Sequence, residues 1–399
     1  MNLREQWFFK RGVENSLLLY ILLFLACLNF EGRGPVFFFI YSIYGIIVSK
    51  NVEWDNSLIP YIALFVGAFI PSVIFYDIND IIKSFTYYLC FFAAYRAYYA
   101  AENKESYLFR TVWTAVLGLF SHLLLLYFSN FMILEHIEGE RMLIDFWTGD
   151  FIQVTIVGLV SSVPIAFSFY CLFLSRNVVS VVLGALFLGV AFLINVDTAT
   201  RTPFVIFAIV YAVLFWEVFR SSEGRKKVHM VLFFVVLFVL LAFKFLPYLE
   251  TTAIGQRYEE DGMETSRLQL MGDYFNLMVE YPFGGGFGEK TIQKQAHNFI
   301  QEGYDMFGIL FFLALILIVF QIIVREIKLH TIINKNKCTY LIFILYLVIL
   351  LQSLTEPVIQ GYPQLLWLLF VVDGFAVPYI RDNYEIIQEE AQEETQEDV

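Results

Sequence analysis

Long uncharged runs of apolar residues, separated by short polar connections, make up most of this chain. The pattern is clearest in Leu58–Tyr76, Val178–Val196, Val228–Phe243 and Phe311–Val324, which carry few or no charges. A helix of about 20 such residues spans a bilayer and bonds its own backbone groups. A membrane β-barrel would instead alternate apolar and polar residues in segments of about 10. The pattern therefore predicts an all-α polytopic membrane protein.

Extended to the whole chain, the same pattern predicts twelve transmembrane helices, with one large loop between the ninth and the tenth. The expected helices are Leu17–Phe30, Pro35–Ser49, Leu58–Tyr76, Ile81–Ala100, Leu108–Leu134, Phe151–Leu174, Val178–Val196, Pro203–Phe219, Val228–Pro247, Phe307–Val324, Thr339–Leu354 and Tyr362–Ile380. The expected regions are an N-terminal segment at 1–16, helices one to nine in 17–247, the large loop at 248–306, helices ten to twelve in 307–380, and a disordered acidic tail at 381–399.

The positions of Lys and Arg predict the orientation, because these residues are retained on the cytoplasmic side of a membrane. With the N-terminus inside, basic residues concentrate in the inner connections, for example at Arg225-Lys226-Lys227 and at Lys335 and Lys337. Both termini are therefore expected in the cytoplasm and the large loop outside. A shorter outer segment, Glu135–Asp150, mixes acidic and apolar residues and is expected to lie along the membrane interface.

Composition supports the membrane class and excludes others. Apolar residues make up 59% of the chain and charged residues 16%, against roughly 45–50% and 25% in soluble domains. Much of the net charge of −12 comes from the final acidic stretch, and no basic patch with interleaved aromatics predicts nucleic-acid binding. The four cysteines lack the C-x-x-C spacing of zinc or redox sites. The run Glu259-Glu260-Asp261 is interpreted as a solvated loop face, so neither a metal nor a cofactor is expected.

The large loop contains a predicted short helix that opens with an arginine. Ser266-Arg267-Leu268-Gln269 has the Ser and Gln spacing of a capping box, and Pro282 marks the end of the helix. Between these signals, apolar residues repeat at helical spacing at Leu268, Met271, Phe275 and Met278. Arg267 in the first turn predicts an anion site together with the free N–H groups of the helix. The alternative is an interfacial helix with a snorkelling arginine.

Two further elements follow in the same loop. Tyr281–Gly288 is glycine-rich but lacks the spacing of a P-loop. It is interpreted as a tight structural turn, with close approach of a ligand to the backbone at Gly286 as the alternative. Asn298 followed by Gln301 then predicts a helix start. His297, just before it, is either a structural histidine or a group that accepts a proton from a hydroxyl.

One short connection on the same outer face also carries charge. Asp197 and Arg201 lie between the seventh and eighth expected helices. Arg201 stands at the apolar boundary, where a charge is costly unless it has a partner or a function. It is expected either to bind an anionic ligand or, if the turn is helical, to pair with Asp197.

Taken in order, these elements resemble the O-antigen polymerase/ligase superfamily. That family has an Arg in a short outer turn, then a large outer loop with an Arg that opens a short helix, a Pro followed by glycines, and His-Asn separated by nine residues from a Gly. Thr200-Arg201-Thr202 and Ser266-Arg267 match the first two elements, and Pro282 with Gly284, Gly286 and Gly288 resembles the third. His297-Asn298 is followed by nine residues and Gly308, whereas Phe311 departs from the Gly, Thr or Tyr of the family. The match covers Val178–Val324.

The resemblance implies a GT-C-like membrane glycosyltransferase of the bacterial inner membrane. Its donor would be a glycan on undecaprenyl diphosphate and its acceptor a hydroxyl on another glycan. Arg201 and Arg267 would bind the diphosphate, His297 would orient or deprotonate the acceptor, and Asn298 and Gly286 would line the substrate. Further partners would be membrane lipids and a chain-length regulator or flippase of the same pathway.

Three functions remain open at this stage. A polymerase would extend a lipid-linked chain of repeat units, and is preferred because no distinct site for a lipid A core is evident. A ligase would transfer the finished chain to lipid A–core or another acceptor. A transporter of lipid-linked oligosaccharides is the alternative of another class. It would need charged residues near the bilayer midplane or internal repeats, whereas the candidate polar residues gather on one outer face and no repeat is evident.

Overall fold

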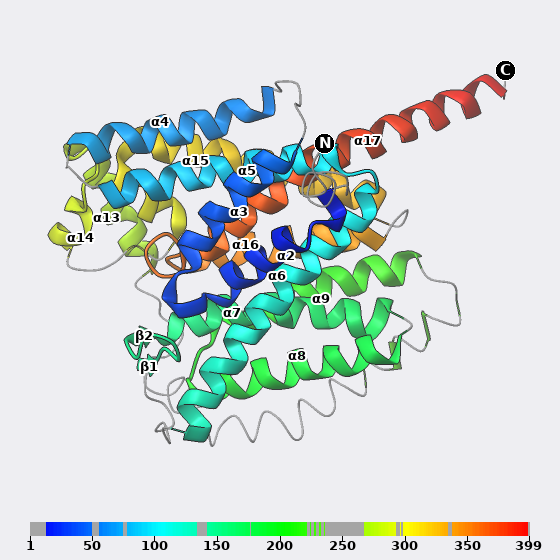
Figure 1. The fold of residues 1–399 in the computed structure, drawn as a ribbon, viewed down its shortest axis with the longest axis horizontal. Helices are drawn as coiled ribbons and strands as arrows, with labels where there is room; N and C mark the ends of the chain where they lie inside the picture. The colour runs from blue at the N-terminus through cyan, green and yellow to red at the C-terminus, as the bar shows by residue number, and fades with distance from the viewer. Residues whose placement is uncertain are drawn as a thin grey trace, which may run out of the picture. The chain divides into compact units, whose positions relative to one another are not determined.

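The computed structural model of the chain is almost entirely helical (Figure 1). It describes residues 13–49, 56–74, 78–133, 142–175, 177–221, 267–292, 296, 298–333 and 337–397, with isolated helical positions between 224 and 235. These residues contain eight helices that are long and apolar enough to cross a membrane, by length and composition. The protein is therefore an all-α membrane protein.

The chain divides into two compact units. Unit 1 comprises residues 1–118 and 269–399, and unit 2 comprises residues 119–268. The helices of unit 1 are α2 (Leu17–Leu28), α3 (Gly34–Val48), α4 (Ile59–Ile74), α5 (Ile78–Ala100), the first part of α6 (Lys104–Tyr127), α13 (Arg267–Glu280, of which Arg267 and Leu268 fall in unit 2), α14 (Phe287–Ile292), α15 (Phe299–Ile332), α16 (Lys337–Thr355) and α17 (Pro363–Glu397). Unit 2 contains the end of α6, the strands β1 (Met142–Ile144) and β2 (Phe151–Gln153), and the helices α7 (Val154–Phe169), α8 (Val178–Asp197) and α9 (Thr202–Ser221).

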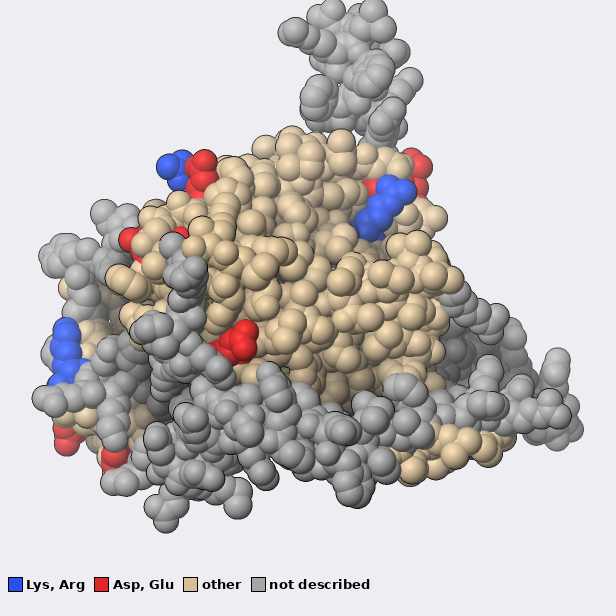
Figure 2. All heavy atoms as spheres, turned by 90° about the horizontal axis from the view of Figure 1, so that it is seen from below, with Lys and Arg blue, Asp and Glu red and all other residues tan. Residues whose placement is uncertain are grey.

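The surface of the helices is largely apolar. On the face drawn in Figure 2, charged side chains appear at a few separate places, and uncharged residues cover most of the described surface. Large apolar side chains are widely exposed, for example Val178 at 75% and Val179 at 71%. Soluble monomers rarely expose such extended apolar surface. Lipid chains, which are as apolar as these side chains, are the solvent that such a surface requires.

In unit 1, α17 packs closely against α5. Gly374 of α17 leaves no room for a Cβ beside the carbonyl of Phe91 in α5. Small residues allow such close approach of helices, because packing rather than water drives helix association in a bilayer. The aromatic rings of Tyr87 and Phe370 meet edge to face at the same interface, 5.4 Å apart. A glycine thus fixes the distance between the two helices, and rings fill the space beside it.

One buried carboxylate connects four helices of unit 1. Asp373 of α17 accepts hydrogen bonds from Arg325 of α15, Tyr61 of α4 and Tyr346 of α16. Asp373 and both tyrosines are fully buried. A buried charge is tolerated only when it is paired and its remaining bonding positions are filled. Three donors meet that requirement here, and they fix the positions of α4, α15 and α16 around α17.

In unit 2, α7 is buried from Val157 to its end at Phe169, which matches its continuous apolar sequence. Ser161 of α7 accepts a hydrogen bond of 2.8 Å from the amide of Asn195 in α8. Ser168 of α7 bonds the hydroxyl of Tyr211 in α9. Hydrogen bonds between small polar residues therefore join α7 to both neighbours, as is common between helices in a bilayer.

The outer segment Glu135–Asp150 was expected to lie along the membrane interface, and its described part folds into a hairpin. Strands β1 and β2 pair antiparallel, with Leu143 opposite Ile152. The side-chain amide of Asn130 bonds both backbone groups of Ile144, at 2.8 and 2.9 Å. Leu143 is fully buried. Asn130 thus supplies the bonds that an edge strand needs, and the position of the hairpin at the membrane interface stays a prediction.

Each expected span other than the ninth overlaps a helix, and the bounds agree within a few residues at most ends. The eight membrane-length helices correspond to spans three, five to eight and ten to twelve. Helices α2 and α3 are apolar but shorter, and α5 carries Lys83 and Arg96 within its length. The ninth span, Val228–Pro247, lies largely outside the described residues. The total of twelve stays a prediction.

Two boundaries differ from the prediction. The tenth span was expected to begin at Phe307, whereas α15 begins at Phe299 and is interrupted at Gly308. The tail at 381–399 was expected to be disordered, whereas α17 continues to Glu397. The tail is rich in Glu, Gln and Ala, which favour helix, and it extends a helix that is already formed and so avoids the cost of nucleation.

Replacing Asp373 with Asn should destabilise the protein, because it leaves the guanidinium of Arg325 buried without a counter-charge. We expect a loss of about 3–5 kcal/mol in the free energy of unfolding, measured by equilibrium unfolding in mixed micelles. The matched control is Asp382→Asn on the same helix, which removes a more exposed pair with Lys104 and should cost under about 1 kcal/mol. Equal losses in the two variants would contradict the role assigned to Asp373.

Candidate functional site

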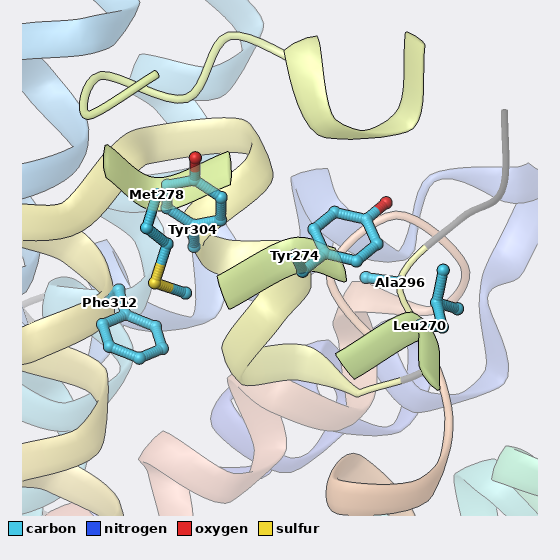
Figure 3. Close-up of a cluster of buried hydrophobic side chains, with 6 residues drawn as sticks. All are labelled: Leu270, Tyr274, Met278, Ala296, Tyr304 and Phe312. Carbon is cyan, nitrogen blue, oxygen red and sulfur yellow. The ribbon is translucent and has the colours of Figure 1, made fainter. Parts of the chain in front are cut away.

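The short helix predicted in the large loop is present and packs onto the following helix. Helix α13 is described from Arg267 to Glu280, just before Pro282, so the predicted helix and its end are confirmed, whereas the capping residue Ser266 lies outside the described residues. Its buried side chains join those of α15 in one cluster (Figure 3), made of Leu270, Tyr274, Met278, Ala296, Tyr304 and Phe312. This part of the loop is therefore attached to α15 through apolar contacts.

The buried face of α13 differs from the predicted one. The prediction took Leu268, Met271, Phe275 and Met278 as the apolar face, and of these only Met278 is described as buried. The side chains of Leu268 and Met271, like that of Arg267, lie outside the described ones. Phe275 is 51% exposed, although its ring contacts Phe312 edge to face at 6.2 Å. Leu270 and Tyr274, which the prediction left out, are buried together with Met278 against α15.

The glycine-rich segment is a turn that fits into the interruption of α15. Gly308 has φ 82° and ψ −173°, which breaks the helix. The backbone of the turn forms hydrogen bonds with α15 on both sides of this break. Ile309 N–H donates to the Pro282 carbonyl at 2.8 Å, and Gly286 N–H donates to the Asp305 carbonyl at 2.8 Å. A Cβ on Gly308 would lie 2.5 Å from the Pro282 oxygen. The interpretation as a tight structural turn is therefore confirmed.

Gly286 differs from Gly284, which lies in the same turn. Its φ is also positive, at 71°, but a Cβ built on it would meet nothing within 4 Å among the described atoms. Gly284, by contrast, is packed against the carbonyls of Tyr304 and Asp305. The open side of Gly286 is compatible with the predicted substrate contact, which stays a prediction.

The helix start predicted at Asn298 is confirmed. The Asn298 side-chain oxygen accepts from Gln301 N–H at 2.9 Å, and its amide donates to the Gln301 side-chain oxygen at 2.8 Å. Asn298 is buried. Its side chain thus caps the first turn of α15, which is a structural role. The predicted contact of Asn298 with substrate stays a prediction, and His297 lies outside the described residues.

A buried carboxylate one turn further along α15 was missed in the sequence. Glu302 accepts hydrogen bonds from the backbone N–H groups of Ile359, at 2.7 Å, and of Gln360. It is 2% exposed. Glu302 therefore holds the connection between α16 and α17 against the start of α15. An acidic residue in the first turn of an apolar helix is the signal that points to such a role, because a charge there needs partners.

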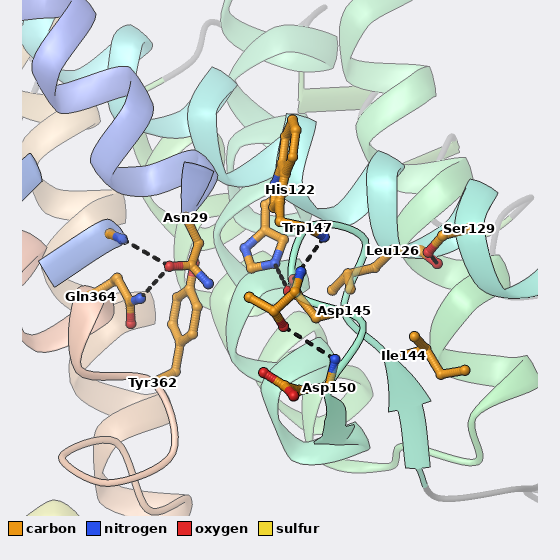
Figure 4. A network of polar contacts seen from close by, with 12 residues as sticks. Asn29, His122, Leu126, Ser129, Ile144, Asp145, Trp147, Asp150, Tyr362 and Gln364 are labelled. Carbon is orange, nitrogen blue, oxygen red and sulfur yellow. Dashed lines mark hydrogen bonds and ion pairs between the residues drawn. The ribbon is translucent and has the colours of Figure 1, made fainter. Parts of the chain in front are cut away.

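The same connection is also anchored to the N-terminal helices. Gln364 donates to the side-chain oxygen of Asn29 at 2.9 Å, and Gly34 N–H donates to the same oxygen at 3.0 Å (Figure 4). The hydroxyl of Tyr362 bonds the Cys27 carbonyl at 3.3 Å. Together with Glu302, these bonds give the start of α15 a rigid support within unit 1.

Arg201 lies in unit 2, in the connection between α8 and α9. It is partly exposed and directly precedes Thr202, the first residue of α9. The connection is anchored by polar groups: Thr198 and Thr200 share a hydroxyl hydrogen bond of 2.8 Å, and Thr200 N–H donates to the Asn195 carbonyl at 2.9 Å. A guanidinium beside the free N–H groups of a helix start can bind an anion.

The turn between Asp197 and Arg201 is not helical. Ala199 has φ 51°, in the left-handed region, so the two side chains lack the spacing of a helical i, i+4 pair. The premise of the predicted helical pairing is therefore wrong. Both alternatives for Arg201, an anionic ligand or a structural ion pair, stay open.

Unit 2 contains a buried polar pair, His122 and Asp145, that the sequence analysis also missed. His122 of α6 and Asp145 after β1 point toward one another (Figure 4), with 4.0 Å between Nε2 and Oδ2. The other oxygen of Asp145 accepts from the N–H groups of Trp147 and Thr148, each at 2.9 Å. Asp145 thus shapes the hairpin turn and attaches it to α6. A His in an apolar span and an Asp that opens a turn carry little signal individually, because only the fold brings them together.

The structure thus brings some predicted site elements together and leaves others apart. Within unit 1 it joins the glycine turn, the capped start of α15 and the body of α13. Arg201 belongs to unit 2, the side chain of Arg267 is not described, and the convergence of these two with His297 stays a prediction. Comparison with protein-family models gave no matching family, and comparison with curated proteins gave no matching relative.

Replacing Gly308 with Ala should destabilise the junction between the glycine turn and α15, because a Cβ has no space there and the backbone is left-handed. We expect a loss of more than about 2 kcal/mol in the free energy of unfolding. The matched control is Gly272→Ala in α13, where a Cβ meets nothing within 4 Å; it should stabilise by roughly 0.5–1 kcal/mol.

Gly286→Ala is the intermediate case, with a positive φ but open space, and should cost about 1–2 kcal/mol. Equilibrium unfolding of the three variants in mixed micelles measures the order. If Gly308→Ala proved as stable as Gly272→Ala, the turn would not be fitted into the helix interruption as described.

Proposed function

We propose that this protein joins glycans carried on undecaprenyl diphosphate at the outer face of the bacterial inner membrane. The observation that carries the proposal concerns Asn298 and Gly308, the two ends of one sequence motif, which both have a structural role in α15. Asn298 caps the helix, and Gly308 interrupts it where the Pro282–Gly286 turn docks. Two motifs that resemble those of the O-antigen polymerase/ligase superfamily therefore form one packed unit, immediately beside the candidate base His297.

The orientation of the proposal follows from the charges. Twelve spans with both termini in the cytoplasm put the large loop, the α8–α9 connection and the start of α15 on the outer face. Lipid-linked repeat units are presented on that face for assembly into surface glycans. The loop elements and Arg201 then act on the same side of the membrane.

The proposed reaction is a glycosyl transfer without a covalent enzyme intermediate. The acceptor hydroxyl oxygen forms a bond to the anomeric carbon of the donor, and the bond from that carbon to the diphosphate oxygen breaks. Arg201 and Arg267 stabilise the negative charge that grows on the departing diphosphate. His297 takes the proton of the hydroxyl. Asn298 and Gly286 contribute by holding the backbone around the acceptor.

Within this function, the polymerase is preferred to the ligase. A polymerase extends a lipid-linked chain, whereas a ligase transfers a finished chain to lipid A–core or another acceptor. Product analysis of cells lacking the protein separates the two: surface lipids capped with a single repeat unit indicate a lost polymerase, and long chains left on undecaprenyl diphosphate indicate a lost ligase. A transporter of lipid-linked oligosaccharides is the alternative of another class and would move the donor without joining it.

Replacing Arg201, Arg267 or His297 with Ala should each lower glycan joining by roughly 10²–10³-fold, because each removes a group that acts in the transition state. The measurement is product length on gels, using liposomes that contain the purified protein and lipid-linked repeat units extracted from a strain that lacks it. Arg220→Ala, at the other end of α9 from Arg201, is the matched control and should retain activity. Normal products from all three variants would end the assignment of the site.

Joining should proceed in the presence of a chelator of divalent ions. Two guanidinium groups can neutralise a departing diphosphate, so the proposed reaction does not call for a metal ion. The same liposome assay with excess EDTA should give undiminished product. Complete loss of product with EDTA, restored by magnesium or manganese, would show that the two arginines do not suffice.

A further inference from the structure

Glu326 of α15 has a buried carboxyl group without a partner. Both side-chain oxygens are shielded from solvent, and neither has a hydrogen-bond partner in the part of the chain that the structure describes. The residue as a whole is partly exposed, so its aliphatic part rather than its polar end reaches the surface. A buried polar group without a partner is rare and calls for a physical explanation. The proposed glycan-joining reaction does not use Glu326.

The position of Glu326 along α15 explains why its oxygens are covered. Ile322 lies one turn before it and Leu329 one turn after it, and both are fully buried. Residues three or four apart are neighbours on the surface of a helix. On the other side of Glu326, Ile323 and Ile327 are exposed. Glu326 therefore lies at the edge of the face that α15 packs against other helices, where an acidic residue interrupts an apolar stripe.

The basic residues nearest to Glu326 along the chain have other partners. Arg325 donates to Asp373 of α17, and the ammonium of Lys328 lies over an aromatic ring of the same helix. His330 follows Glu326 by one turn of α15. None of these three cationic or titratable groups acts electrostatically on the carboxyl of Glu326.

The helices packed against α15 supply no counter-charge either. Helix α4 contains no charged residue, and α16 contains only Lys337. The charged residues of α17 whose side chains are described are Asp373, Arg381 and Asp382. The other titratable groups of the three helices, within the same described part, belong to Tyr61, Cys338, Tyr340, Tyr346, Tyr379 and Tyr384. None of these groups acts on the carboxyl of Glu326.

An ionised carboxylate that is buried without a partner is very costly, whereas the neutral acid avoids most of that cost. Asp373 is the contrasting case in the same unit, because its three donors allow it to be charged. We propose that Glu326 is a proton-binding site, which holds its proton as a neutral carboxylic acid at neutral pH. The proton takes the place of the missing counter-charge. The carboxyl then ionises only when this part of α15 is opened to water, a property that goes beyond the proposed glycan-joining function.

The test is infrared difference spectroscopy of the full chain in liposomes at neutral pH. The C=O stretching band of a carboxylic acid is separate from the bands of a carboxylate, and an ordinary glutamate is ionised above about pH 4.3. The spectrum of the wild-type protein minus that of Glu326→Gln should contain a carboxylic acid band, which shifts when the water is replaced by D₂O. A difference spectrum with carboxylate bands in place of the acid band would overturn the proposal.

The matched control is Asp382→Asn, because Asp382 is paired with the ammonium of Lys104 at 2.6 Å. Its difference spectrum should contain carboxylate bands and no acid band. Circular dichroism checks that both variants are folded. Glutamine has the shape and the charge of the neutral acid, so a Glu326→Gln variant that failed to fold would also contradict the proposal. Because no glycan takes part, the result does not depend on the glycosyltransferase proposal.

Discussion

A helix that is interrupted where its backbone is buried needs a partner segment, because water cannot reach the unpaired N–H and C=O groups. Helix α15 breaks at Gly308, and the turn at Pro282–Gly286 supplies that partner through backbone hydrogen bonds to residues on both sides. The arrangement of the large loop depends on this junction. Helix α13 comes directly before the turn, packs on Tyr304 and Phe312, and is thereby held at a fixed place on α15.

Two buried carboxylates support this junction from the rest of unit 1. Glu302 ties the start of α15 to the α16–α17 connection, and Asp373 ties a later turn of α15 to three other helices through Arg325 and the tyrosines. With both ends held, α15 is a rigid base for any group carried on its first turn. Sites on such elements keep their geometry better than sites on loops. Each buried carboxylate requires hydrogen-bond partners, and because these partners lie on other helices, the carboxylate also fixes how the helices are arranged.

Hydropathy predicted the helices because the bilayer imposes one dominant requirement on each span. The local signals were also reliable where chain neighbours decide the outcome: Asn298 and Gln301 marked a helix start, and Pro282 marked a helix end. Features decided by distant partners were not predictable. The face that α13 buries depends on Tyr304 and Phe312, and the fold of the hairpin depends on Asn130. The pairing of His122 with Asp145 likewise exists only once unit 2 has folded. Of the candidate site, the backbone framework was therefore predictable, and the side-chain partners were not.

The junction at Gly308 also bears on how such a protein can change over evolution. The docking surface is made of main-chain atoms from two segments, and a Cβ at Gly284 or Gly308 would collide with it. A loop borrowed from another protein would fit only if its turn matched the helix interruption. The turn and the first half of α15 should therefore be inherited together, and a recombination event that replaced one of them would have to replace the other. The exposed face of α13 carries no such restriction, so its sequence can change without disturbing the junction.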